Sequence, residues 1–164
     1  TVAPTTTVAP TTTVAPTTTV SESAGERNAR ESAASYLEYS AFSRSGLVEQ
    51  LEYEGFTTAQ AEYGTDAQNA DWNEQAALSA ASYLEYSAFS RSGLVEQLEY
   101  EGFTTAQAEY GTDAQNADWN EQAALSAASY LEYSAFSRSG LVEQLKYEGF
   151  TTAQAEYGAT AVGL

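Results

Sequence analysis

The sequence contains no histidine, no cysteine and no methionine. Without imidazole or thiolate groups the chain cannot form a Ser-His-Asp or Cys-His catalytic centre, or the usual zinc, haem and iron–sulfur sites. It also has no disulfide framework, so cysteine usage does not reveal a redox compartment. We therefore expect neither an enzyme nor a bound cofactor.

Basic residues are scarce as well: 6 Lys and Arg stand against 23 Asp and Glu, a net charge of −17 at pH 7. Such a chain repels phosphate backbones, so we expect no nucleic-acid partner and instead a protein partner with a basic surface. The acids form no metal motif either. A calcium-binding EF-hand loop begun at Asp66 would need an oxygen ligand, a glycine and a glutamate where the chain has Ala70, Asp71 and Ala77.

Residues 1–20 carry no charge and repeat Thr-Val-Ala-Pro-Thr-Thr with a period of six. Pro4, Pro10 and Pro16 each remove a backbone donor, which excludes a helix or a packed strand. Threonine outnumbers valine and alanine combined, so the segment is not a transmembrane span. We predict a disordered linker. Both a Thr/Pro stalk that holds a domain away from a surface and a plain spacer fit this composition.

The rest of the chain is a repeat with a period of 47 residues. Ser32–Gly64 returns unchanged as Ser79–Gly111, and again as Ser126–Gly158 with Lys146 as the one difference. A fixed period of this size indicates stacked supersecondary units. The predicted fold is all-α, with three tandem three-helix helix-turn-helix repeats joined by long connector helices. The expected repeats are 21–64, 65–111 and 112–164, after the linker 1–20.

Helix ends are marked by capping residues. Asp71, followed by Glu74, predicts the start of a connector helix over 71–87. The second helix of the first repeat is expected from the N-cap Ser43 to a left-handed stop at Gly55. The third helix is expected from Thr57, in a capping box with Gln60, to an end at Gly64. The residues predicted to form the core of this repeat are Tyr36, Leu37, Phe42, Leu47, Val48, Leu51, Phe56, Ala61 and Tyr63.

The first repeat differs from the others where a preceding neighbour would pack. The second repeat has Trp72 and Leu78 in its connector helix, whereas the first has Gly25 and Glu31 at the equivalent positions. A terminal repeat loses its apolar contact face and gains charge, so we interpret the first repeat as a cap. The alternative is that the duplicated segment simply begins at Ser32.

The repeat resembles that of the Ltp family, the host cell surface-exposed lipoproteins of Gram-positive bacteria and their phages. The matching positions in the first copy are Ala33, Tyr36, Leu37, Phe42, Ser43, Gly46, Leu47, Gln50, Leu51, Glu54, Gly55, Phe56, Ala61 and Tyr63. The resemblance implies helix-turn-helix units displayed outside the membrane and, for phage-encoded members, superinfection exclusion, in which DNA injection by an incoming phage is blocked. The chain has no lipobox cysteine, so we expect membrane contact only through an anchor missing from this chain.

Tyrosines among carboxylates form the candidate partner-binding surface. In the first copy, Tyr53 follows Glu49 by one turn on the side of the second helix opposite its apolar stripe, and Tyr39 lies near the border of the stripe on the first helix. Tyrosine gives contact area and glutamate gives orientation in protein recognition. The equivalent residues in the later copies are Glu96, Tyr100, Glu143, Tyr147, Tyr86 and Tyr133. Alternatively, these tyrosines cover gaps between the repeats.

These features predict an extracytoplasmic, surface-displayed protein-interaction module, expected to be monomeric. It would bind a basic phage protein involved in DNA injection. The competing prediction is a cell-envelope adhesin or structural spacer with no antiphage role. DNA recognition by the helix-turn-helix geometry is not expected, because the third helix carries Glu62 and no Lys or Arg.

Overall fold

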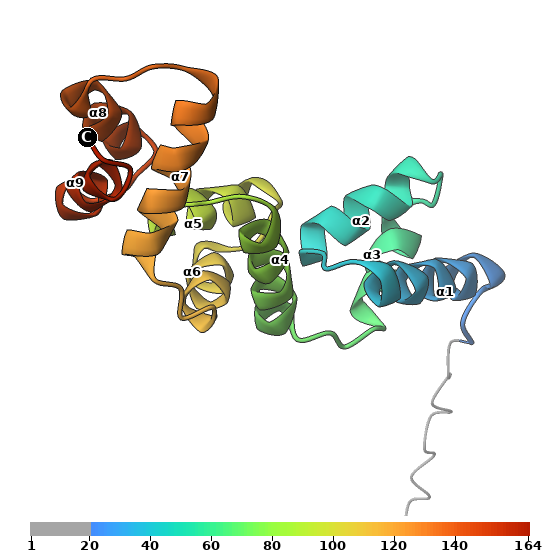
Figure 1. Cartoon of the computed structure of the whole chain (residues 1–164). Coiled ribbons are helices and arrows are strands. Elements are labelled where there is room, and N and C mark those ends of the chain that lie inside the picture. The colour runs from blue at the N-terminus through green and yellow to red at the C-terminus, as the bar shows by residue number, and fades with distance from the viewer. Residues whose placement is uncertain (1–20) are drawn as a thin grey trace, which may run out of the picture.

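The computed structural model describes residues 21–164, which form nine α-helices and no strand. The linker predicted for residues 1–20 lies outside the described part. The helices form three repeats of three, and Figure 1 shows these repeats following one another as an extended array with α1–α3 and α7–α9 at opposite ends. The all-α, three-repeat prediction is confirmed. The helices are α1 Ala24–Tyr39, α2 Arg44–Tyr53, α3 Thr58–Asp66, α4 Trp72–Tyr86, α5 Arg91–Tyr100, α6 Thr105–Ala114, α7 Trp119–Tyr133, α8 Arg138–Tyr147 and α9 Thr152–Ala161.

The predicted caps form as expected. Ser43 caps α2 by accepting a hydrogen bond from the amide of Gly46 at 2.9 Å. Thr57 and Gln60 form a reciprocal capping box at the start of α3. Gly55 follows α2 with φ +96°, the left-handed conformation that glycine adopts without a Cβ clash. Each of these signals acts within a few residues of the helix end that it marks.

One predicted helix end is wrong. The third helix does not stop at Gly64, because α3 continues to Asp66 and buries this glycine inside it. Its position is a helix crossing: a Cβ added to Gly64 would lie 2.6 Å from the carbonyl carbon of Ala29 in α1. The first and third helices make the most extensive contact within each repeat. The glycine is therefore required for close helix packing and not for chain reversal.

The core is smaller and more alanine-rich than predicted. In the first repeat the fully buried apolar residues are Ala29, Ala33, Leu47, Leu51 and Ala61. Trp72 is among the partly buried side chains around the main cluster. Partly buried Tyr36, Leu37, Phe42, Val48 and Phe56 also pack against this cluster. Tyr63 was wrongly expected in the core: it is 38% exposed, and its hydroxyl donates to Glu22 at 3.3 Å. The small alanines allow the first and third helices to approach closely.

The helix predicted over 71–87 is α4, and it contacts two repeats. Trp72, its first residue, packs against the core of the first repeat, whereas Ala76 and Ala80 are buried in the core of the second. Trp119 at the start of α7 packs in the same way on the second core. Of the two apolar residues expected to pack on a preceding repeat, Trp72 does so, whereas Leu78 is 52% exposed.

No helix within residues 21–164 combines the length and the apolar character needed to cross a membrane.

Candidate functional site

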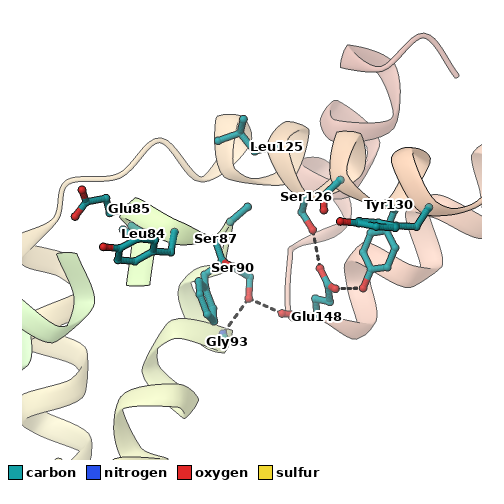
Figure 2. Close-up of a pocket in the computed structure, with 14 residues that line it drawn as sticks. Leu84, Glu85, Ser87, Ser90, Gly93, Leu125, Ser126, Tyr130 and Glu148 are labelled. Carbon is teal, nitrogen blue, oxygen red and sulfur yellow. Dashed lines mark hydrogen bonds between the residues drawn. The ribbon is translucent and has the colours of Figure 1, made fainter. Parts of the chain in front are cut away.

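Two grooves, here called the junction grooves, lie where consecutive repeats meet. The first has a volume of about 670 Å³ and runs between the C-terminal end of α1 and the side of α4. The second, about 720 Å³, lies between the C-terminal end of α4 and the side of α7 (Figure 2). Because the repeats are nearly identical in sequence, the two grooves are equivalent sites separated by one repeat.

A glutamate held by hydrogen bonds lines each groove. In the second groove, the Glu148 carboxylate accepts from the Ser126 hydroxyl at 2.8 Å and from the Tyr130 hydroxyl, as Figure 2 shows. Tyr130 itself accepts from Gln144 at 3.0 Å. In the first groove, Glu101 accepts in the same way from Ser79 at 2.8 Å and from Tyr83. The carboxylates are thus fixed in orientation before any ligand arrives.

The same contacts keep the tyrosines protonated. The hydrogen bond to Glu148 is the largest effect that raises the pKa of Tyr130, because deprotonation would place an anion beside the carboxylate. The pKa of Tyr83 is raised first by burial and then by its hydrogen bond to Glu101. Both hydroxyls therefore remain donors well above neutral pH.

Hydrogen bonds between repeats hold the groove walls together. The Ser43 hydroxyl donates to the backbone carbonyl of Glu101 at 2.5 Å, and the Ser45 hydroxyl donates to that of Gly102 at 2.8 Å. The amide of Phe42 donates to the Gln75 side chain at 3.3 Å. The junction between the second and third repeats makes the same bonds, from Ser90 to Glu148, from Ser92 to Gly149 and from Phe89 to Gln122. The N-terminus of α2 thus meets the C-terminal turn of α5, and the N-terminus of α5 meets that of α8, an alignment that the helix dipoles favour.

Three of the tyrosines predicted to bind a partner lie at the grooves. Tyr39 lines the first groove, Tyr133 lines the second, and Tyr86 lines both. All three are at least four-fifths exposed, so they do not fill the gap between the repeats. Leu78 and Leu125, each 52% exposed, add an apolar surface to the first and second groove, respectively.

The other predicted site residues lie elsewhere. They are exposed on the second helix of each repeat and line neither groove: Glu49, Tyr53, Glu96, Tyr100, Glu143 and Tyr147. The third copy of this surface differs in charge, because Lys146 pairs with Glu143 at 2.8 Å. The structure therefore separates the predicted set into a groove group and an outer group.

The acidic surface is not balanced internally. All six basic side chains are in ion pairs, among them Arg44 with Asp66 at 2.6 Å and Arg91 with Asp113 at 2.7 Å. The other pairs involve Arg27, Arg30, Arg138 and Lys146. No basic side chain lines a junction groove, whereas Glu38 and Glu101 line the first and Glu85 and Glu148 line the second. The grooves are thus suited to cationic groups.

Glu101 and Glu148 were missed as site residues, although their environment leaves a signal in the sequence. Ser79 and Tyr83 are four residues apart on one face of α4, and Glu101 directly precedes a glycine stop. What the pattern does not contain is the position of the preceding repeat, which converts this hydrogen-bonded cluster into a groove wall.

Comparison with known proteins identifies the repeats. A family profile described as host cell surface-exposed lipoprotein matches residues 25–67, 71–114 and 118–162, one match for each three-helix unit. No curated protein and no solved structure matches the chain. Since the profile matches account for most of the sequence, the chain belongs to the family of host cell surface-exposed lipoproteins.

Proposed function

We propose that this chain is an extracytoplasmic protein-interaction module that binds a protein with a basic surface. The observation that carries the proposal is the unbalanced charge: every basic side chain is already paired with an acid, and the net charge is still −17. Surplus carboxylates beside exposed tyrosines attract and orient basic protein surfaces. The module works as a monomer, without a cofactor and without chemical conversion of its partner.

The proposed consequence is superinfection exclusion. Membership in a family of host cell surface-exposed lipoproteins supports display on the outer surface of the cell, where incoming phage first meet the host. A surface-bound acidic array would capture a basic phage component that acts in DNA injection, and the phage DNA would remain outside.

The test expresses the complete gene in a phage-sensitive Gram-positive host and measures both phage adsorption and injection of labelled phage DNA. We expect normal adsorption and strongly reduced injection compared with cells carrying the empty vector. Undiminished injection would exclude the antiphage role and leave the adhesin or spacer function.

A capture experiment distinguishes these two functions directly. The purified array is incubated with a phage lysate and, in parallel, with an extract of the host envelope. We expect retention of a basic phage protein that is released as the salt concentration rises, because charge attraction is screened. Retention of envelope components alone would support the adhesin.

A further inference from the structure

We propose that the two junction grooves are the partner-binding sites, and that each receives a lysine or arginine side chain from one extended basic segment. This inference deepens the proposed function, because it assigns the basic partner to a particular surface. It keeps Tyr39, Tyr86 and Tyr133 from the sequence-based hypothesis but leaves out the outer faces of α2, α5 and α8, which that hypothesis also included.

Charge complementarity gives the first argument. Two glutamates and no basic side chain line each groove. A carboxylate has about four acceptor positions. Glu148 uses one on each oxygen, for Ser126 and for Tyr130. The remaining positions can accept hydrogen bonds from an ammonium or guanidinium group, and bonds between two charged groups are the stronger kind.

Preorganisation gives the second argument. Two hydroxyls fix each groove carboxylate, and the backbone beside it is fixed by the preceding repeat, since Ser90 donates to the carbonyl of Glu148 at 2.5 Å. Figure 2 shows these bonds converging on Glu148 from both sides of the junction. A cation that binds here does not have to order a flexible acid, which reduces the entropic cost of binding.

The aromatic rim gives the third argument. A tyrosine face attracts a cation, and its ring supplies contact area at low conformational cost. Tyr86 is 82% exposed and lines both the groove that contains Glu101 and the groove that contains Glu148. The half-exposed Leu78 and Leu125 offer apolar contact for the methylene stem of a lysine.

The duplication of the groove gives the fourth argument. Two equivalent sites on one array let a single long partner bind twice, and the second contact forms at a high effective concentration. A partner with several basic residues would therefore be retained far more tightly than one with a single basic residue.

The decisive experiment uses a matched pair of tyrosine variants of the whole chain. The probe is a fluorescein-labelled peptide of alternating lysine and alanine, and its binding is followed by fluorescence anisotropy at near-physiological salt. Tyr86→Ser should weaken binding of the peptide about tenfold, because it removes a ring that lines both grooves. Tyr100→Ser removes an equally exposed ring outside the grooves and should change binding less than about twofold.

A second pair of variants tests the acids without relying on the tyrosines. Glu101→Gln with Glu148→Gln removes both hydrogen-bonded carboxylates from the grooves and should weaken binding about tenfold. Glu49→Gln with Glu54→Gln removes the same charge outside them. Glu54 is a close control, because it accepts from Ser32 at 3.2 Å and from Tyr36 in the same arrangement but lines neither groove. Circular dichroism checks that all variants fold.

The outcomes separate this inference from the proposed function. Loss of peptide binding in the groove variants alone supports the grooves, even if cells with the complete gene still admit phage DNA. Equal losses in both members of each pair, a larger loss with Tyr100→Ser, or no binding of the peptide by the unmodified protein would overturn it. Full phage exclusion by cells carrying the Tyr86→Ser protein would overturn it too.

Discussion

The hydroxyl of Ser43 accepts a hydrogen bond from the amide of Gly46 in its own helix and donates one to the carbonyl of Glu101 in the next repeat, at 2.5 Å. A single side chain thus caps α2 and joins two repeats. Ser90 repeats this relationship with Gly93 and Glu148. Local structure and array assembly therefore depend on the same residue.

The last repeat provides a control for this double role. Ser137 caps α8 through the amide of Gly140 at 3.1 Å, but it is exposed and makes no bond to another repeat within residues 21–164. We expect Ser137→Ala to cost about 1 kcal/mol, the value of an N-cap. Ser90→Ala should cost about 2 to 3 kcal/mol, because it also leaves the carbonyl of Glu148 without its partner. Urea unfolding followed by circular dichroism measures both, and equal losses would show that the junction bond adds no stability.

The glycine at the crossing of the first and third helices leads to a second prediction. A Cβ on Gly111 would lie 2.5 Å from the carbonyl carbon of Ala76, and neither backbone can move away cheaply. We expect Gly111→Ala to destabilise the protein by about 3 kcal/mol through overpacking.

Gly55→Ala is the comparison for Gly111→Ala. No atom lies within 4 Å of its Cβ position among the described residues, so the cost is backbone strain at φ +96°, about 1 kcal/mol. Thermal unfolding of both variants shows which substitution lowers the stability more. If Gly111→Ala lowers it less than Gly55→Ala, α4 and α6 are not held at the close separation that this glycine allows.

The sequence predicts the helix ends of the first repeat better than it predicts the role of Gly64. Ser43, Thr57 and Gly55 act within a few residues of their own helix ends, so local chemistry is enough to place α2 and α3. Gly64 has the same local appearance as a C-terminal stop, yet it serves the contact with Ala29, which lies 35 positions earlier in the chain. Only the packed helices distinguish these two uses of glycine.

The candidate site shows the same limit. The helical pattern places Tyr86, the equivalent of Tyr39, near the border of the apolar stripe and leaves open whether it covers a gap between repeats; its 82% exposure is seen only in the structure. The grooves could not be predicted, since they depend on bonds between residues 58 positions apart, such as Ser43 and Glu101. The period of the repeat defines the units but contains no information on how one unit docks on the next.

A buried hydroxyl in the first two repeats leads to a third prediction. Thr112 is fully buried, and no residue described by the structure offers its Oγ1 a hydrogen-bond partner; the same is true of Thr65. The third repeat has Ala159 at this position. We expect Thr112→Val to raise stability by about 1 kcal/mol, because it keeps the shape and removes an unsatisfied polar group. The reverse test is Ala159→Thr, which should lower the denaturation midpoint. A stabilising Ala159→Thr would mean that the hydroxyl finds a partner.

The fourth prediction concerns acid. Hydrogen bonds from the Arg44 and Arg91 guanidinium groups hold the pKa values of Asp66 and Asp113 below their ordinary range. A folded-state pKa that is depressed stabilises the protein above the unfolded pKa, about 4, and this contribution disappears as the pH falls through the folded value. Both pairs are exposed, so each is worth less than about 1 kcal/mol, and salt weakens it further.

The measurement compares the melting temperatures of the unmodified chain and of Asp66→Asn with Asp113→Asn as a function of pH. At neutral pH the variant should melt slightly lower, because the ion pairs are gone. As the pH falls below the folded-state pKa values the two curves should converge, since the aspartates are then neutral in both proteins. Protonation of the other carboxylates lowers their mutual repulsion in both proteins alike. The difference between the two melting temperatures at each pH therefore reports on Asp66 and Asp113 alone. A difference that persists in strong acid would mean that the aspartates stabilise the fold by neutral hydrogen bonding and not by charge.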